Sequence, residues 1–113
     1  MSRRTSQQDT GDELEQEALR IAKEFFDGAC LTKGSGSVNQ DGDVAGVPGL
    51  HVECKNSVKP GKGRSISKKD WNAIKAKARR RLLIPAHVGF DDDREIVVLV
   101  PFKDLLALLM EAP

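Results

Sequence analysis

Residues 43–55 read DVAGVPGLHVECK, and this stretch decides the fold that the sequence predicts. Val47-Pro48-Gly49 is typical of a tight turn. The segment from Leu50 onward alternates apolar with polar residues, which predicts a strand with one face toward the core. The opposite face of this strand carries His51, Glu53 and Lys55. A hairpin through the turn would bring Asp43 alongside Glu53, so that two carboxylates and a lysine converge.

Two carboxylates in this arrangement suit Mg²⁺, which is commonly held by one or two carboxylates together with water and substrate phosphate oxygens. A bound Mg²⁺ stabilises charge on a phosphoryl oxygen and lowers the pKa of its water, which Lys55 would orient. A Glu-x-Lys pattern is also typical of an exposed cross-strand salt bridge. The aspartate, the turn Gly34–Ser37 before it and the basic segment after it favour the metal site.

The rest of the chain predicts an α/β domain. Helical spacing of apolar residues begins near Asp12 and stops near Gly28. A second helix is expected over 67–82, where Ser67 caps the start, Asp70 completes the cap and Leu82 lies on the apolar face with Trp71. Strands are expected at 29–33, 86–90 and 95–100, and a final helix at 102–110. This order predicts a central mixed sheet flanked by helices.

Length and composition limit the class of protein. The chain has 113 residues, 39% of them apolar, which favours one soluble domain over 12–113 after a flexible tail at 1–11. The sequence lacks an apolar run long enough to cross a membrane, and no signal peptide is recognised, so an intracellular location is expected. Two cysteines are too few for a disulfide scaffold or a structural zinc site. The sequence contains no phosphate-binding loop motif, so no nucleotide cofactor is expected.

Positive charge is concentrated in one part of the chain. The net charge is only +1, but residues 55–81 hold eleven Lys and Arg against Asp70 alone. Such a segment is typical of proteins that bind the phosphate backbone of nucleic acids, although a solvated helix face has the same composition. The residues expected to contact DNA are Lys33, Lys59, Lys62, Arg64, Lys68, Lys69 and Lys75.

These residues together resemble the PD-(D/E)xK nucleases, and more narrowly the small archaeal-type Holliday junction resolvases. The resemblance runs from about Leu14 to Leu109. It includes a glutamate on the first helix, the Gly-Ser-Gly-Ser turn, the aspartate, the Glu-x-Lys strand and a capped basic helix. It ends with Val100-Pro101-Phe102, which is similar to the start of the resolvases' final helix. The resemblance implies a restriction-endonuclease-like fold.

The resemblance also implies roles for individual residues. Asp43 and Glu53 look like the metal ligands, and Lys55 looks like the catalytic lysine. The backbone carbonyl of Cys54 is similar to a further metal ligand. Glu15 is similar to a helix-borne glutamate of the active site, and Ser35 to a serine near the scissile phosphate. The family's proline before the aspartate is Gly42 here, and Asp41 is a rival for the role of Asp43.

The function implied is a Mg²⁺-dependent endodeoxyribonuclease, with Mn²⁺ as a substitute, that cuts both strands of a four-way DNA junction as a homodimer. The final helix is apolar almost all round, which favours an interface between two chains, although a helix buried within one chain has the same pattern. Two other functions stay open. One is a PD-(D/E)xK nuclease that acts on flaps, ends or specific sites, and the other is a non-catalytic DNA-binding module.

Overall fold

The computed structural model describes residues 6–32, 43–55, 58–59, 63–64 and 66–111, and the side chains of 13–32, 43–55 and 66–111. In chain order the elements are α1 (Ser6–Phe25), β1 (Cys30–Leu31), β2 (Val44–Ala45), β3 (Leu50–Cys54), β4 (Val58–Lys59), β5 (Gly63–Arg64), α2 (Lys68–Arg80), β6 (Ile84–Phe90), β7 (Ile96–Leu99) and α3 (Phe102–Glu111). The predicted α/β class is confirmed.

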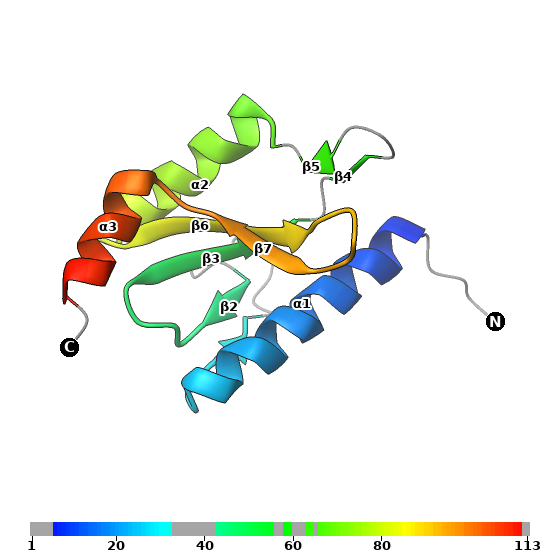
Figure 1. The fold of residues 1–113 in the computed structure, drawn as a ribbon, viewed down its shortest axis with the longest axis horizontal. Coiled ribbons are helices and arrows are strands. Elements are labelled where there is room, and N and C mark those ends of the chain that lie inside the picture. The colour runs from blue at the N-terminus through cyan, green and yellow to red at the C-terminus, as the bar shows by residue number, and fades with distance from the viewer. Residues whose placement is uncertain (1–5, 33–42, 56–57, 60–62, 65, 112–113) are drawn as a thin grey trace.

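A mixed sheet of five strands, in the order β1-β2-β3-β6-β7, forms the centre of the protein (Figure 1). Neighbouring strands are antiparallel except β3 and β6, which are parallel and are connected through α2. A parallel pair needs such a crossover, because the chain must return to the same end of the sheet. Two short strands outside this sheet, β4 and β5, form a separate antiparallel pair.

Both faces of β3 and β6 are covered by helices, with α1 on one side of the sheet and α2 on the other (Figure 1). Leu14 and Ala18 of α1 belong to a buried cluster with Val52 of β3 and Val88 of β6. Strand side chains alternate between faces, so the neighbouring His51 points to the other side, where α2 packs. His51 is fully buried there and Glu53, on the same face, is half-buried, so α2 covers much of the polar face of β3.

The boundaries of α1 and α2 differ from the prediction. α1 begins at Ser6, within the stretch expected to be a tail. The predicted cap of α2 is confirmed, because the Ser67 side chain accepts the Asp70 N–H. α2 ends at Arg80, and the expectation that Leu82 lies on its buried face is wrong. Leu82 adopts φ 59° and is 93% exposed, because the chain turns out of the helix as the Leu83 N–H donates to the Ala78 carbonyl.

The turn between β2 and β3 packs closely against the end of α1. Gly46 has φ +85°, and a Cβ at this position would lie 2.3 Å from the carbonyl oxygen of Gly28. Only glycine fits both the left-handed backbone and this approach. The contact fixes the hairpin that carries Asp43 and Glu53 against the rest of the domain.

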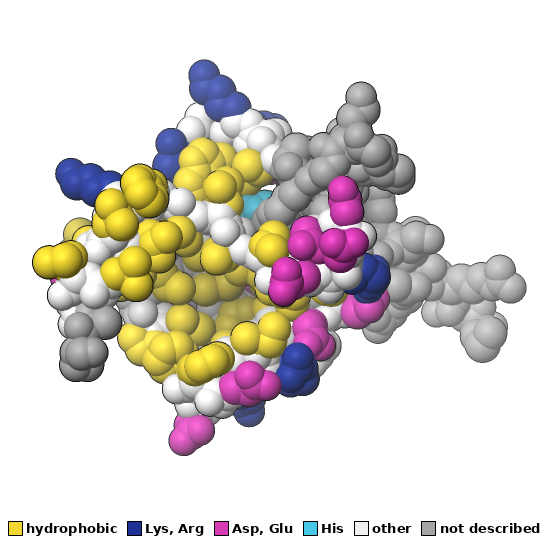
Figure 2. Space-filling view, in the orientation of Figure 1, with side chains coloured by type: hydrophobic (Ala, Val, Ile, Leu, Met, Phe, Trp, Pro, Cys, Tyr) yellow, Lys and Arg dark blue, Asp and Glu magenta, His cyan; other side chains and the backbone are white. Residues whose placement is uncertain are grey.

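α3 is poorly covered by the rest of the chain. Its bounds agree with the prediction, but none of its residues is buried, and Phe102 and Met110 are 73% and 85% exposed. Asp104 connects it to Arg79 of α2 through an ion pair of 2.9 Å. Figure 2 shows hydrophobic side chains gathered over α3 and across the neighbouring strands. The sequence left open whether this helix forms an interface between two chains or is buried within one chain, and the structure contradicts burial within one chain.

Within the described part of the chain, the structure contains no helix with the length and apolar character that crossing a bilayer requires.

Candidate active site

Asp43 and Glu53 come together at the end of β3, as the sequence predicts. The Asp43 N–H donates to the Val52 carbonyl at 2.7 Å, which aligns Asp43 with β3. The Asp43 carboxylate then accepts the backbone N–H of Cys54 through Oδ2, also at 2.7 Å. Glu53 lies on the face of β3 that α2 covers. The local fold of the hairpin thus places two carboxylates side by side.

The two carboxylates have opposite pKa shifts. Burial raises the pKa of Asp43, the Cys54 N–H opposes this, and the negative charge of Glu53 adds to the increase. The pKa of Glu53 is lowered, mainly by its hydrogen bond with His51 and further by Lys77, against the effect of its own burial. Neighbouring carboxylates with divergent pKa values are typical of functional sites, because like charges are held together there.

Glu53 has two partners that the sequence did not predict. His51 Nε2 lies 3.2 Å from Oε1 of Glu53, and Lys77 Nζ lies 3.4 Å from the same oxygen. His51 is also 3.2 Å from Arg81, through its other ring nitrogen, Nδ1. Lys77 and Arg81 are four residues apart at the end of α2, so they lie on the same side of the helix. This i, i+4 spacing is the sequence signal that could have identified them.

Lys55 occupies a different position from the one predicted. Its Nζ lies 2.7 Å from Oδ2 of Asp70, at the start of α2, rather than on Asp43 or Glu53. The hydrogen bond with Lys55 is the largest cause that lowers the pKa of Asp70, followed by that with Ser67. The Lys55 side chain is 55% exposed. Solvent screens an exposed ion pair of this kind and leaves it weak, so Lys55 can exchange Asp70 for another partner at little cost.

The donor set fits a hard divalent cation. Oδ2 of Asp43 receives the Cys54 N–H, and Oε1 of Glu53 receives both His51 and Lys77. Among the described residues, no hydrogen bond reaches Oδ1 of Asp43 or Oε2 of Glu53, so each carboxylate keeps one oxygen for a cation. The described residues include no cluster of three or more His, Cys, Asp or Glu that could hold a metal. Mg²⁺ needs only these two carboxylates, because water and phosphate oxygens fill its other positions.

The other predicted site residues are described only in part. Glu15 is half-buried on α1, and its role in the site stays a prediction. The backbone of Cys54 is placed beside Asp43 by its N–H. Ser35, Lys33 and Asp41 lie outside the residues that the structure describes.

The predicted DNA-binding residues are described only in part. Lys68 and Lys69 are exposed in the first turn of α2, and Lys75 lies over the Trp71 ring at 5.8 Å. Lys62 lies outside the described residues, as do the side chains of Lys59 and Arg64, whose backbones form part of the β4–β5 pair. The basic segment is therefore divided: Lys77 and Arg81 contact the site, while Lys68 and Lys69 face solvent.

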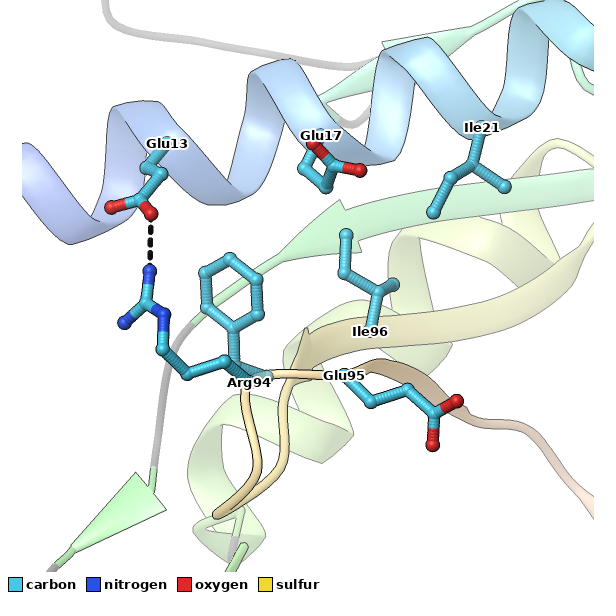
Figure 3. Close-up of a pocket in the computed structure, with 7 residues that line it drawn as sticks. Glu13, Glu17, Ile21, Arg94, Glu95 and Ile96 are labelled. Atoms are coloured by element: carbon cyan, nitrogen blue, oxygen red, sulfur yellow. Dashed lines mark hydrogen bonds and ion pairs between the residues drawn. The ribbon is translucent and has the colours of Figure 1, made fainter.

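A separate hollow of about 340 Å³ lies between α1 and the β6–β7 hairpin (Figure 3). Arg94 forms an ion pair with Glu13 at its rim and lies over the Phe90 ring. Glu17 and Glu95 also line it. None of the residues around Asp43 and Glu53 lines this hollow, so it is distinct from the candidate active site.

No model of a known protein family, no curated protein and no solved structure matches this chain. The relation to the PD-(D/E)xK nucleases therefore stays a prediction that depends on the residues themselves.

Proposed function

We propose that the protein is a Mg²⁺-dependent endodeoxyribonuclease of restriction-endonuclease-like fold that cuts four-way DNA junctions. The observation that carries this proposal is the convergence of Asp43 and Glu53 at the end of β3. The described residues form hydrogen bonds with only one oxygen of each carboxylate, and the other oxygen could bind a cation. The capped basic helix α2, which follows the Glu-x-Lys strand, is one of the features on which the resemblance to the resolvases depends, and it supports the proposal.

The reaction is hydrolysis of a phosphodiester. Bound by Asp43 and Glu53, Mg²⁺ (or Mn²⁺) would lower the pKa of a water and neutralise charge on the phosphate. The water oxygen forms a bond to phosphorus and loses a proton to solvent, while the bond from phosphorus to the 3′-oxygen breaks and that oxygen takes up a proton. The products carry a 5′-phosphate and a 3′-hydroxyl. Lys55 would release Asp70 and orient the attacking water instead.

DNA would lie along the start of α2, where Lys68 and Lys69 are exposed. Contacts of this kind are made to phosphates and carry no sequence information. Selectivity for a junction would then come from the position of two active sites relative to each other. This requires a dimer, because each chain has one Asp43–Glu53 pair.

The exposed apolar surface of α3 supports a homodimer. Leu106 and Leu109 are 45% and 64% exposed, and Val98 and Leu99 of the neighbouring β7 are 52% and 40% exposed. Contiguous apolar surface of this kind is typical of protein–protein interfaces. A symmetric pair made through α3 would cover the same side chains on both chains.

The test compares junction cleavage and junction binding in two isosteric variants, Asp43→Asn and Glu53→Gln. Each variant removes a metal ligand but little DNA contact. We expect cleavage to be abolished and binding to stay within about threefold of wild type. Asp92→Asn, at the exposed hairpin tip, is the matched control and should cleave normally.

The result also separates the alternatives. Full activity in either active-site variant would contradict the proposal. Cleavage of flaps or ends but not junctions would identify a different nuclease with the same site, and metal-independent binding without cleavage would identify a DNA-binding module.

A further inference from the structure

The neighbours of His51 form a connected chain of polar groups behind the candidate metal site. His51 is fully buried between β3 and α2. Its Nδ1 lies 3.2 Å from Nη1 of Arg81, and its Nε2 lies 3.2 Å from Oε1 of Glu53. The chain therefore runs from the end of α2, through a buried imidazole, to a carboxylate of the site.

The chemistry of Arg81 determines which ring nitrogen carries the proton. A guanidinium only donates hydrogen bonds, so Nδ1 of His51 must be the acceptor in this pair. A carboxylate only accepts, so Nε2 must carry the hydrogen that Glu53 receives. A doubly protonated ring would place an N–H against the guanidinium of Arg81. The two contacts together favour the tautomer that carries its hydrogen on Nε2.

The fold holds this arrangement in place. Arg81 caps the C-terminal end of α2, where its own N–H reaches the carbonyls of Ala78 and Arg79. The left-handed turn at Leu82 then ends the helix and leads into β6. Ala78, one turn before, is fully buried, which fixes this end of α2 against the sheet. Arg81 is therefore held at the C-cap of α2 by backbone hydrogen bonds.

We propose that His51 is a positioning residue that fixes the Glu53 carboxylate for cation binding, with Arg81 selecting its Nε2–H tautomer. The hydrogen bond from His51 occupies Oε1, and since none of the described residues donates to Oε2, we assign that oxygen to the cation. This inference rests on the proposed function, because it assumes that Glu53 is a metal ligand. Hydrogen-bond partners of metal-ligating carboxylates typically contribute about 10–100-fold to metal affinity.

The first measurement is the tautomer of His51 in the metal-free, full-length protein. A long-range ¹H–¹⁵N spectrum distinguishes the protonated ring nitrogen from the other. The chain has only two histidines, so the signals that disappear in a His51→Gln variant assign His51. We expect a single Nε2–H form in the wild type and a mixture of tautomers in Arg81→Met. Arg80→Met, one residue earlier and exposed, should leave the spectrum of His51 unchanged.

The second measurement is the affinity for Mn²⁺ in the absence of DNA, by calorimetric titration. His51→Leu fills the same space without a donor to Glu53, and we expect it to bind Mn²⁺ about tenfold more weakly. His51→Gln keeps an N–H donor and should recover most of the affinity. Should His51→Leu fail to fold, the comparison of Arg81→Met with Arg80→Met gives the same test.

An Nδ1–H tautomer or a doubly protonated ring in the wild type would overturn the inference. So would wild-type Mn²⁺ affinity in folded His51→Leu or Arg81→Met. These outcomes leave the nuclease proposal intact as long as the wild type binds Mn²⁺ and cleaves DNA. A wild type that binds no Mn²⁺ would contradict both the nuclease proposal and the role of His51 in orienting a ligand, whatever tautomer is found.

Discussion

Removal of the positive charge of Lys77 should tighten binding of a divalent cation to the protein. Lys77 Nζ lies 3.4 Å from Oε1 of Glu53, and its charge lowers the pKa of both Glu53 and Asp43. In the metal-free protein this ammonium compensates the two carboxylates. A cation that binds there must overcome repulsion from Lys77 or displace it.

The size of the effect follows from the exposure of the pair. The Lys77 and Glu53 side chains are 36% and 21% exposed, so the ion pair is screened by solvent. Such a pair contributes at most about 1 kcal/mol, which corresponds to about fivefold in Kd. We therefore expect Lys77→Met to bind Mn²⁺ about two- to fivefold more tightly than wild type. Lys77→Met keeps the aliphatic stem and removes only the charge.

Calorimetric titration with Mn²⁺ at pH 8, without DNA, measures this change. Loss of Lys77 raises the pKa of both carboxylates, so protons compete more strongly with the cation and the gain should shrink as the pH falls. Arg80→Met removes a charge from the exposed side of the same helix and should change the Kd by less. Unchanged or weaker Mn²⁺ binding in Lys77→Met at pH 8 would refute the view that Lys77 competes with a cation.

Three further predictions concern DNA binding, assembly and the hairpin. The first variant neutralises three lysines of α2 together, namely Lys68, Lys69 and Lys75. If they bind phosphates, the dependence of log K on log[salt] should weaken by about one for each lost phosphate contact, for junction and duplex DNA alike. An unchanged dependence would mean that these lysines form a solvated helix face. Leu105→Lys and Leu109→Lys, made separately, should convert a dimer to folded monomers in sedimentation equilibrium, and a dimer that survives both would place the interface elsewhere. Gly49→Ala should lower the free energy of unfolding by about 1 kcal/mol because of its positive φ, whereas Gly46→Ala, which also meets the backbone of Gly28, should cost about 2–4 kcal/mol in urea denaturation. Equal losses at the two glycines would argue against the close approach.

Local features of the fold were predictable from the sequence because they depend on neighbouring residues. The Ser67 cap is formed within one helical turn, and alternation over Leu50–Cys54 shows which residues share a face of β3. The convergence of Asp43 on Glu53 needs only one short hairpin. These parts of the prediction involve small sequence separations, where pattern and turn chemistry decide the structure.

The remainder depends on how distant elements pack. His51 was placed correctly on the face of Glu53, but its complete burial results from α2, which the alternation of β3 does not reveal. Glu53 and Lys77 are 24 residues apart, and their contact depends on the crossover from β3 to β6. Leu82 was assigned to an apolar helix face, yet the helix ends two residues before it. Lys55 has Asp70 as its partner because the start of α2 returns beside the end of β3.

The most direct test of the proposed function is cleavage of a synthetic four-way DNA junction by the full-length protein, with a linear duplex of the same sequence as a parallel substrate. Each substrate is incubated with Mg²⁺ or with EDTA, and the products are resolved on a denaturing gel. We expect paired nicks in the junction with Mg²⁺, 5′-phosphate and 3′-hydroxyl ends, little cleavage of the duplex and no cleavage in EDTA. Cleavage that persists in EDTA, or a folded protein that cuts neither substrate with Mg²⁺ or Mn²⁺, would contradict the proposal that Asp43 and Glu53 hold a catalytic cation.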